Sequence, residues 1–122
     1  MEPERPLLHG HTRAERRSLH LHRLALDELR RRPELRARVL ALLERWLADE
    51  ATMSSRKWLE EWNALLREGD VERLASRVLD PEGGQTLRQC SPLGPALTPA
   101  ERWKALREVN EALREEARGP GP

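Results

Sequence analysis

The sequence predicts an all-α fold, a compact bundle of about five helices with an irregular Pro/Gly strap before the last helix. Three observations support this prediction. Apolar side chains recur at helical spacing in several stretches, capping residues precede most of them, and no alternating pattern is long enough for a strand. With 122 residues, the chain has the length of one domain with its own core.

The first predicted helix spans residues 12–31. Thr12 and Glu15 have the spacing of a capping box, in which each side chain accepts a hydrogen bond from a free backbone amide of the first turn. At 100° per residue, one face carries Ser18, Leu19, His22, Ala25, Leu26 and Leu29. We therefore expect His22 to be a hydrogen-bonded core or interface residue, and His20 on the other face to be solvated.

The second predicted helix spans residues 33–49. Pro33 ends the first helix and suits the first position of the next, where its missing N–H costs no hydrogen bond. The apolar stripe of this helix contains Leu35, Val39, Leu42, Leu43 and Trp46. Because the junction is short, the two helices are expected to form an antiparallel hairpin or a steep corner.

Two shorter helices are predicted next. Residues 56–68 follow a polar break at residues 52–55 and end at Gly69, a residue that tolerates a left-handed backbone. Asp70 can then cap a helix over residues 71–79.

The most distinctive stretch lies near the C-terminus. Residues 85–90 have room for one helical turn, and residues 91–97 contain two Pro and one Gly, which block a regular helix. Thr98, Pro99 and Glu101 then predict a strong helix start. The last helix has an apolar stripe of Trp103, Leu106, Val109 and Leu113.

These elements predict a single helical domain over residues 12–117. We expect residues 1–11 to be a flexible N-terminal segment and residues 118–122 to be a disordered tail. There is no apolar run long enough to span a membrane and no signal-peptide pattern, so a cytoplasmic, bacterial protein is expected.

No pattern for catalysis, a metal or a cofactor is found. Cys90 is the only cysteine, which excludes an intramolecular disulfide and a Cys-based zinc site. His20 and His22 are separated by about 200° around a helix, so they cannot ligate one ion together. Phosphate-binding loops, nucleophile elbows and Rossmann glycine patterns are absent from the sequence. We predict a protein that is not an enzyme and uses no cofactor.

The charge distribution leaves one question open. The formal net charge of +1 argues against a dedicated nucleic-acid-binding protein. Residues 12–38, however, contain nine Arg against four acidic residues, and Arg30, Arg31 and Arg32 are consecutive. Three interpretations stay open: contacts with phosphates, contacts with an acidic partner protein, or a solvated face beside a helix C-terminus. A helix-turn-helix through residues 71–90 is disfavoured, because its second helix is very short.

One segment resembles a known group of proteins. Residues 87–103 read LRQCSPLGPALTPAERW. This resembles the C-terminal tail L-R-Q-S-[ST]-P-F-x-G-x-L-[ST]-P-x-E-R-W of small, mostly uncharacterised bacterial all-helical proteins. The chain departs from the pattern at Cys90, Leu93 and Pro95. The resemblance implies the antitoxin of a toxin–antitoxin pair, whose partner is a nucleotidyltransferase-like or nuclease toxin.

We therefore expect a protein-binding module that neutralises a partner toxin by covering it. The predicted partner-binding residues are Arg88, Gln89, Leu93, Arg102 and Trp103, with Arg30, Arg31 and Arg32 as a charged second contact. Arg and Trp are chosen because they most often dominate interface energies. Trp103 has a second interpretation as a core residue. The alternative function is a small DNA-binding transcriptional regulator that uses the basic first helix.

Overall fold

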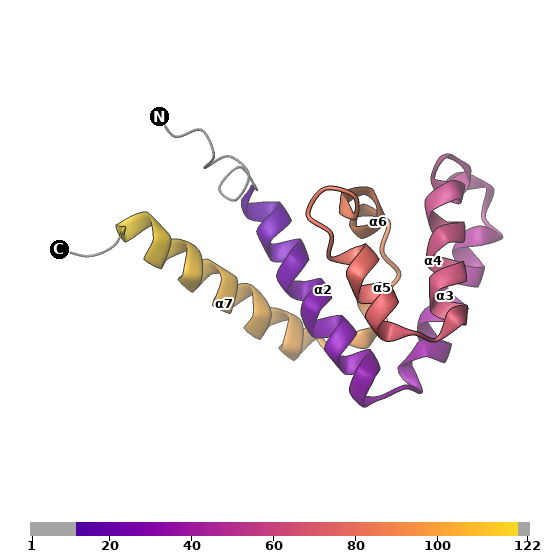
Figure 1. Cartoon of the computed structure of the whole chain (residues 1–122), viewed down its shortest axis with the longest axis horizontal. Helices are drawn as coiled ribbons and strands as arrows, with labels where there is room; N and C mark the ends of the chain where they lie inside the picture. Colours follow the sequence, from indigo (N-terminus) through magenta and orange to yellow (C-terminus); the bar gives the residue numbers. More distant parts are fainter. Residues whose placement is uncertain (1–11, 120–122) are drawn as a thin grey trace.

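The computed structural model describes residues 12–119 and gives them an all-α fold (Figure 1). Within this range there are six α-helices and no strand. They are α2 (Arg13–Arg31), α3 (Leu35–Leu47), α4 (Arg56–Glu68), α5 (Val71–Val78), α6 (Gln85–Gln89) and α7 (Pro99–Arg118). The predicted fold class is confirmed, and α6 is the short turn expected before the strap. The predicted flexible segment at residues 1–11 lies outside the described residues.

The helices pack in an order that leaves α7 at one side. Helices α3 and α4 lie side by side, and α5 and α6 fill the space between α4 and α2 (Figure 1). The strap, which we define as residues 91–97, contacts both α2 and α3 through its central turn. Helix α7 packs along α2, and among the described residues a hydrogen bond from Arg102 to the Gly94 carbonyl also links it to the strap.

Helix α2 starts as the sequence predicts. The Thr12 hydroxyl accepts from the Glu15 amide, and the Glu15 carboxylate accepts from the Thr12 amide, both at 3.0 Å. At the other end of α2 the chain turns a steep corner at Pro33. Helices α2 and α3 are in contact only near this corner, and they then diverge on either side of α5 and α6 (Figure 1). Helix α3 begins at Leu35, two residues later than predicted.

Two segments expected to be irregular form short 3-10 helices. The first is η1 (Glu50–Ser55), where the Asp49 carboxylate accepts from the Ala51 amide and the Thr52 hydroxyl donates to the Asp49 carbonyl. The second is η2 (Gly94–Ala96) inside the strap. The strap therefore has no regular α-helix, as predicted, but it contains one 3-10 turn that was not predicted. The N–H groups at the start of a helix have no acceptor within that helix. Pro95 lies at the start of η2, so the N–H group that proline lacks costs this turn no hydrogen bond.

Leucine and one tryptophan dominate the core. The Trp62 side chain is completely buried, and its Nε1 donates to the Leu87 carbonyl at 2.8 Å, so α4 is fastened to α6. The other fully buried large side chains include Leu26, Leu35, Leu43, Leu59, Leu66 and Leu87. No helix formed by residues 12–119 has the length and apolarity needed to cross a membrane.

Candidate partner-binding surface

Helix α7 is held to the rest of the protein by a narrow contact. Thr98 and Glu101 form the predicted capping box at its start, with hydrogen bonds of 3.1 and 2.8 Å. Of its 20 residues only Ala105 and Val109 are buried. The contact with α2 is completed by ion pairs, and the Arg16–Glu116 pair places the first turns of α2 beside the last turns of α7.

Trp103 is the most exposed large apolar residue described. Its side chain is 65 % exposed, whereas Val109 in the same predicted stripe is buried and Leu106 and Leu113 are half-buried. The apolar stripe is therefore divided between two environments. Val109 packs on the α2 side, whereas Trp103 at the other edge faces solvent. Of the two interpretations of Trp103, the structure excludes the core residue.

A groove runs between α2, the strap and α7, beside the α2–α7 contact. It encloses about 360 Å³ and is mostly apolar, with lining side chains from Ala14, Leu21, Ala25, Leu93, Leu97 and Leu106. Its polar lining side chains are Arg17, Ser18, His22, Ser91 and Arg102, and no acidic residue lines it. We call this the α2–α7 groove.

The two arginines of the groove have no ion-pair partner among residues 12–119. Arg17 is half-exposed and Arg102 is exposed, and neither forms an ion pair within residues 12–119. Within the described residues the Arg102 guanidinium donates one hydrogen bond, to the Gly94 carbonyl at 3.4 Å. Of the five other arginines of α2, Arg16, Arg30 and Arg31 form ion pairs, whereas Arg17 and Arg102 keep an uncompensated positive charge at the groove.

Arg30, Arg31 and Arg32 are such paired residues. Arg30 donates to Glu72 at 2.7 Å and also pairs with Asp27. Arg31 and Arg32 both pair with a single carboxylate, that of Glu28, which is buried to 6 % exposure. The three arginines that were predicted as a charged second contact therefore form ion pairs within the protein. They lie beside a helix C-terminus, where positive charge is favourable.

Arg88 and Leu93 are both buried, and of the two only Leu93 is among the residues that line the groove. Arg88 is 6 % exposed, and its guanidinium donates to the carbonyls of Val78, Asp80 and Pro81 at 2.8, 2.9 and 3.4 Å. The Val78 carbonyl belongs to the last residue of α5 and the other two lie in the turn after it, so Arg88 supplies donors to carbonyls at a helix end. Burial lowers the pKa of Arg88. Leu93 is 3 % exposed and belongs to the core, although one edge of it lines the groove. The prediction that Arg88 contacts a partner is therefore wrong, because its side chain is buried. The Gln89 side chain is exposed.

His22 forms part of the groove floor. It is 8 % exposed, its Nδ1 lies 2.7 Å from the Ser18 carbonyl, and its ring stacks on Trp62 at 6.5 Å between centroids. The Nδ1 carries the proton, because a carbonyl can only accept. Burial, and secondarily the charge of Arg88, lowers the pKa of His22. His22 is therefore buried and hydrogen-bonded, as expected for a core or interface residue. His20 is not simply solvated, because its Nε2 pairs with Glu108 at 3.0 Å.

The remaining candidate groups show no reactive arrangement. Cys90 is half-buried and donates to the Thr86 carbonyl at 3.2 Å, and burial raises the pKa of its thiol, so the less reactive protonated form is favoured. Among residues 12–119 no three His, Cys, Asp or Glu side chains gather as metal ligands.

The sequence did not reveal the groove, because its two walls come from opposite ends of the chain. Arg17 and Leu21 are four residues apart, so the sequence does predict that they share one face of a helix. That spacing alone does not show that α7 and the strap lie beside them. Comparison with protein-family models, curated proteins and solved structures finds no match for this chain.

Proposed function

We propose that this protein is a non-enzymatic binding module that covers a partner protein with the surface around the α2–α7 groove. The observation that supports this most is the exposed Trp103, whose chain neighbour Arg102 lines an apolar groove. Exposed tryptophan is unfavourable in water and is the residue type that most often dominates interfaces. Arg102, one position before it, adds a donor group without an ionic partner in residues 12–119.

The specific form that we propose is the antitoxin of a bacterial toxin–antitoxin pair. Its support is the likeness of residues 87–103 to the tail pattern described above, and Arg102 and Trp103 are the last two residues of that pattern. In this proposal the toxin's active cleft is blocked by contact, and the partner is a nucleotidyltransferase-like or nuclease toxin.

The test is co-expression with the product of the adjacent gene, followed by affinity measurement with variants. Trp103→Ala combined with Arg102→Ala should weaken binding by about tenfold or more, because an anchor and its neighbouring donor are lost. The circular dichroism signal should not change, since both side chains are exposed.

A matched control is available on another helix. Met53→Ala removes an apolar side chain that is 62 % exposed in η1, far along the chain from α7, and should leave the affinity unchanged. If the Trp103 and Arg102 variant binds as tightly as the wild type, the proposed surface is wrong.

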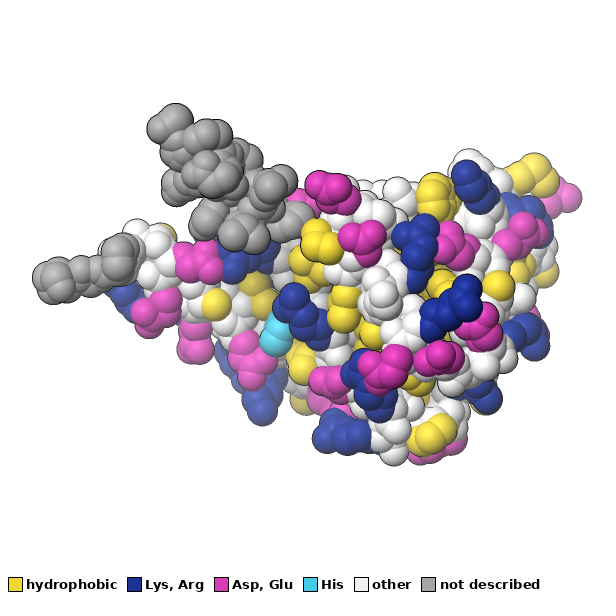
Figure 2. Space-filling model, in the orientation of Figure 1, with side chains coloured by type: hydrophobic (Ala, Val, Ile, Leu, Met, Phe, Trp, Pro, Cys, Tyr) yellow, Lys and Arg dark blue, Asp and Glu magenta, His cyan; other side chains and the backbone are white. Residues whose placement is uncertain are grey.

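The alternative of a DNA-binding regulator has weaker support. The basic first helix loses much of its free charge to Glu116, Asp27, Glu72 and Glu28, which pair with its arginines. Basic and acidic side chains are also intermingled over the face shown in Figure 2. A gel shift with the protein's own promoter distinguishes the two functions, because phosphate binding weakens steeply as salt rises.

A further inference from the structure

The α2–α7 groove is long enough along α2 for about three turns of one helix. Its lining along α2 extends from Ala14 to Ala25, which is about 16 Å or three helical turns. Leu21, Leu97 and Leu106 present apolar surface from three different elements. An occupant with side chains at helical spacing can therefore contact all three elements at once.

The groove offers little to an extended chain. An extended segment needs partners for its own amides and carbonyls, and these normally come from the edge of a sheet. The part of the chain described contains no strand, and the His22 Nδ1 is already bonded to Ser18. A helix satisfies its backbone internally and needs only apolar contact, so it is the better occupant.

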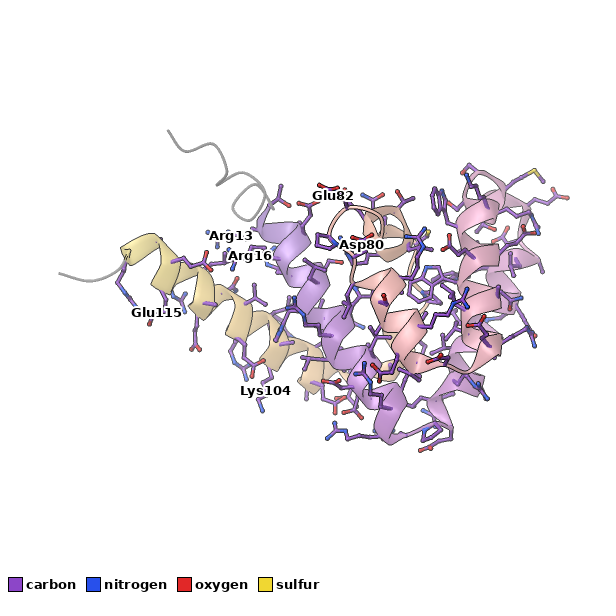
Figure 3. All side chains as sticks on the ribbon, in the orientation of Figure 1. Arg13, Arg16, Asp80, Glu82, Lys104 and Glu115 are labelled. Atoms are coloured by element: carbon purple, nitrogen blue, oxygen red, sulfur yellow. The ribbon has the colours of Figure 1, made fainter. Side chains whose placement is uncertain are left out.

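The charged residues at the groove indicate that its occupant carries negative charge. Arg17 and Arg102 lie on opposite walls, one on α2 and one on α7, and no acidic residue lines the space between them. Arg13, in the first turn of α2, also forms no ion pair within residues 12–119 and projects near Arg16 (Figure 3). A cationic occupant would meet only like charge, whereas carboxylates on the flanks of a helix would face guanidinium groups.

We propose that the α2–α7 groove binds an acidic amphipathic helix of the partner protein, with leucine-like side chains on the groove floor and Asp or Glu flanking them against Arg17 and Arg102. This rests on the proposed binding function and specifies the chemistry of the partner segment. Trp103 follows the groove-lining Arg102 in the chain and is 65 % exposed, so in this proposal it adds contact area outside the groove lining.

The experiment uses the full-length protein and two labelled peptides of about four helical turns. Both carry Leu at every third and fourth position on one face, with Glu on the flanks of one peptide and Lys on the flanks of the other. Fluorescence anisotropy should show binding of the Glu peptide that weakens as salt rises, and binding of the Lys peptide at least about tenfold weaker.

Charge reversal provides the decisive comparison. Arg17→Glu combined with Arg102→Glu should weaken binding of the Glu peptide by about tenfold and strengthen binding of the Lys peptide. The matched control is Arg38→Glu combined with Arg45→Glu. It changes the net charge equally on exposed α3 positions that do not line the groove, and should leave both affinities close to wild type.

Four results would overturn the inference. The first three are no binding of the Glu peptide, equal binding of both peptides, or a reversal variant that behaves like its α3 control. The fourth is displacement of the Glu peptide by a duplex oligonucleotide, which would point to nucleic acid as the ligand. If the adjacent gene product still binds through Trp103 while the Glu peptide does not, only this inference fails and the proposed function stands.

Discussion

Single residues in this protein show that residue type does not reveal where a side chain is used. Arg88 and Arg102 belong to the same predicted motif. Arg88 is buried and donates hydrogen bonds to carbonyls at the end of α5, whereas Arg102 is exposed to solvent. Trp62 and Trp103 differ in the same way, since one is completely buried and the other is 65 % exposed. The difference depends on the packing of neighbouring helices, which a residue's own sequence neighbourhood does not specify.

His22 predicts a pH dependence of stability. The unfolded histidine takes up a proton near its ordinary pKa of 6.5, whereas burial lowers the pKa in the folded protein. Between these two pKa values the unfolded state binds more protons, so the free energy of unfolding should fall as pH decreases, by at most about 1.4 kcal/mol per pH unit. Above the unfolded pKa both states are neutral and this effect vanishes.

Urea unfolding between about pH 7 and 5 measures this slope. His22→Gln keeps an amide donor for the Ser18 carbonyl but does not titrate, so its slope should be smaller than that of the wild type. His20→Gln is the control, because His20 is half-exposed and paired with Glu108. Equal slopes for wild type and His22→Gln would show that His22 is not the titrating group.

At the scale of elements, the helix ends follow the sequence closely. The capping boxes at Thr12 and Thr98 and the left-handed Gly69 were predictable, because each depends on residues next to it in the chain. The 3-10 turns η1 and η2 were not, because their polar side chains and prolines only disfavour a longer helix. Nor was the groove, since its lining combines residues 14–25 with residues 91–106.

The turn between α5 and α6 should depend on one glycine. A Cβ at Gly84 would lie 2.5 Å from the Val78 carbonyl oxygen and 2.7 Å from that of Arg77, with Arg88 also within 3 Å. The backbone must move to relieve these contacts, so Gly84→Ala should lower the free energy of unfolding by about 1–3 kcal/mol.

Gly94→Ala is the matched control in the strap. There the nearest atom to a Cβ is the Arg102 Nη2 at 3.8 Å, which is an ordinary contact. Its free energy of unfolding should stay within about 0.5 kcal/mol of the wild type. Chemical denaturation of both variants tests the pair, and similar losses would argue against a backbone clash at Gly84.

At the scale of the whole molecule, α7 stands apart from the bundle. Besides the α2–α7 groove, a second hollow of about 510 Å³ flanks the same contact and is lined by residues such as Asp27, Arg31, Glu101 and Lys104. The contact between α7 and α2 is therefore narrow, with space on both of its sides. Figure 1 shows the same arrangement, with α7 lying along α2 only.

This arrangement predicts unequal amide exchange. Helix α4 buries Leu59, Trp62, Leu65 and Leu66 within 13 residues, whereas α7 buries two side chains within 20. Because local opening costs little free energy where few apolar contacts are lost, amides in the middle of α7 should exchange faster than those of α4. Hydrogen exchange followed by mass spectrometry or NMR measures this, and equal protection of α4 and α7 would contradict it.

The solitary position of α7 also bears on how such a protein can evolve. Substitutions on the outer side of that helix, at Trp103 or Arg107, touch none of the leucines that keep the bundle folded. New binding preferences can therefore arise there by mutation without loss of the folded state, so lineages that share this scaffold can diverge in what they recognise.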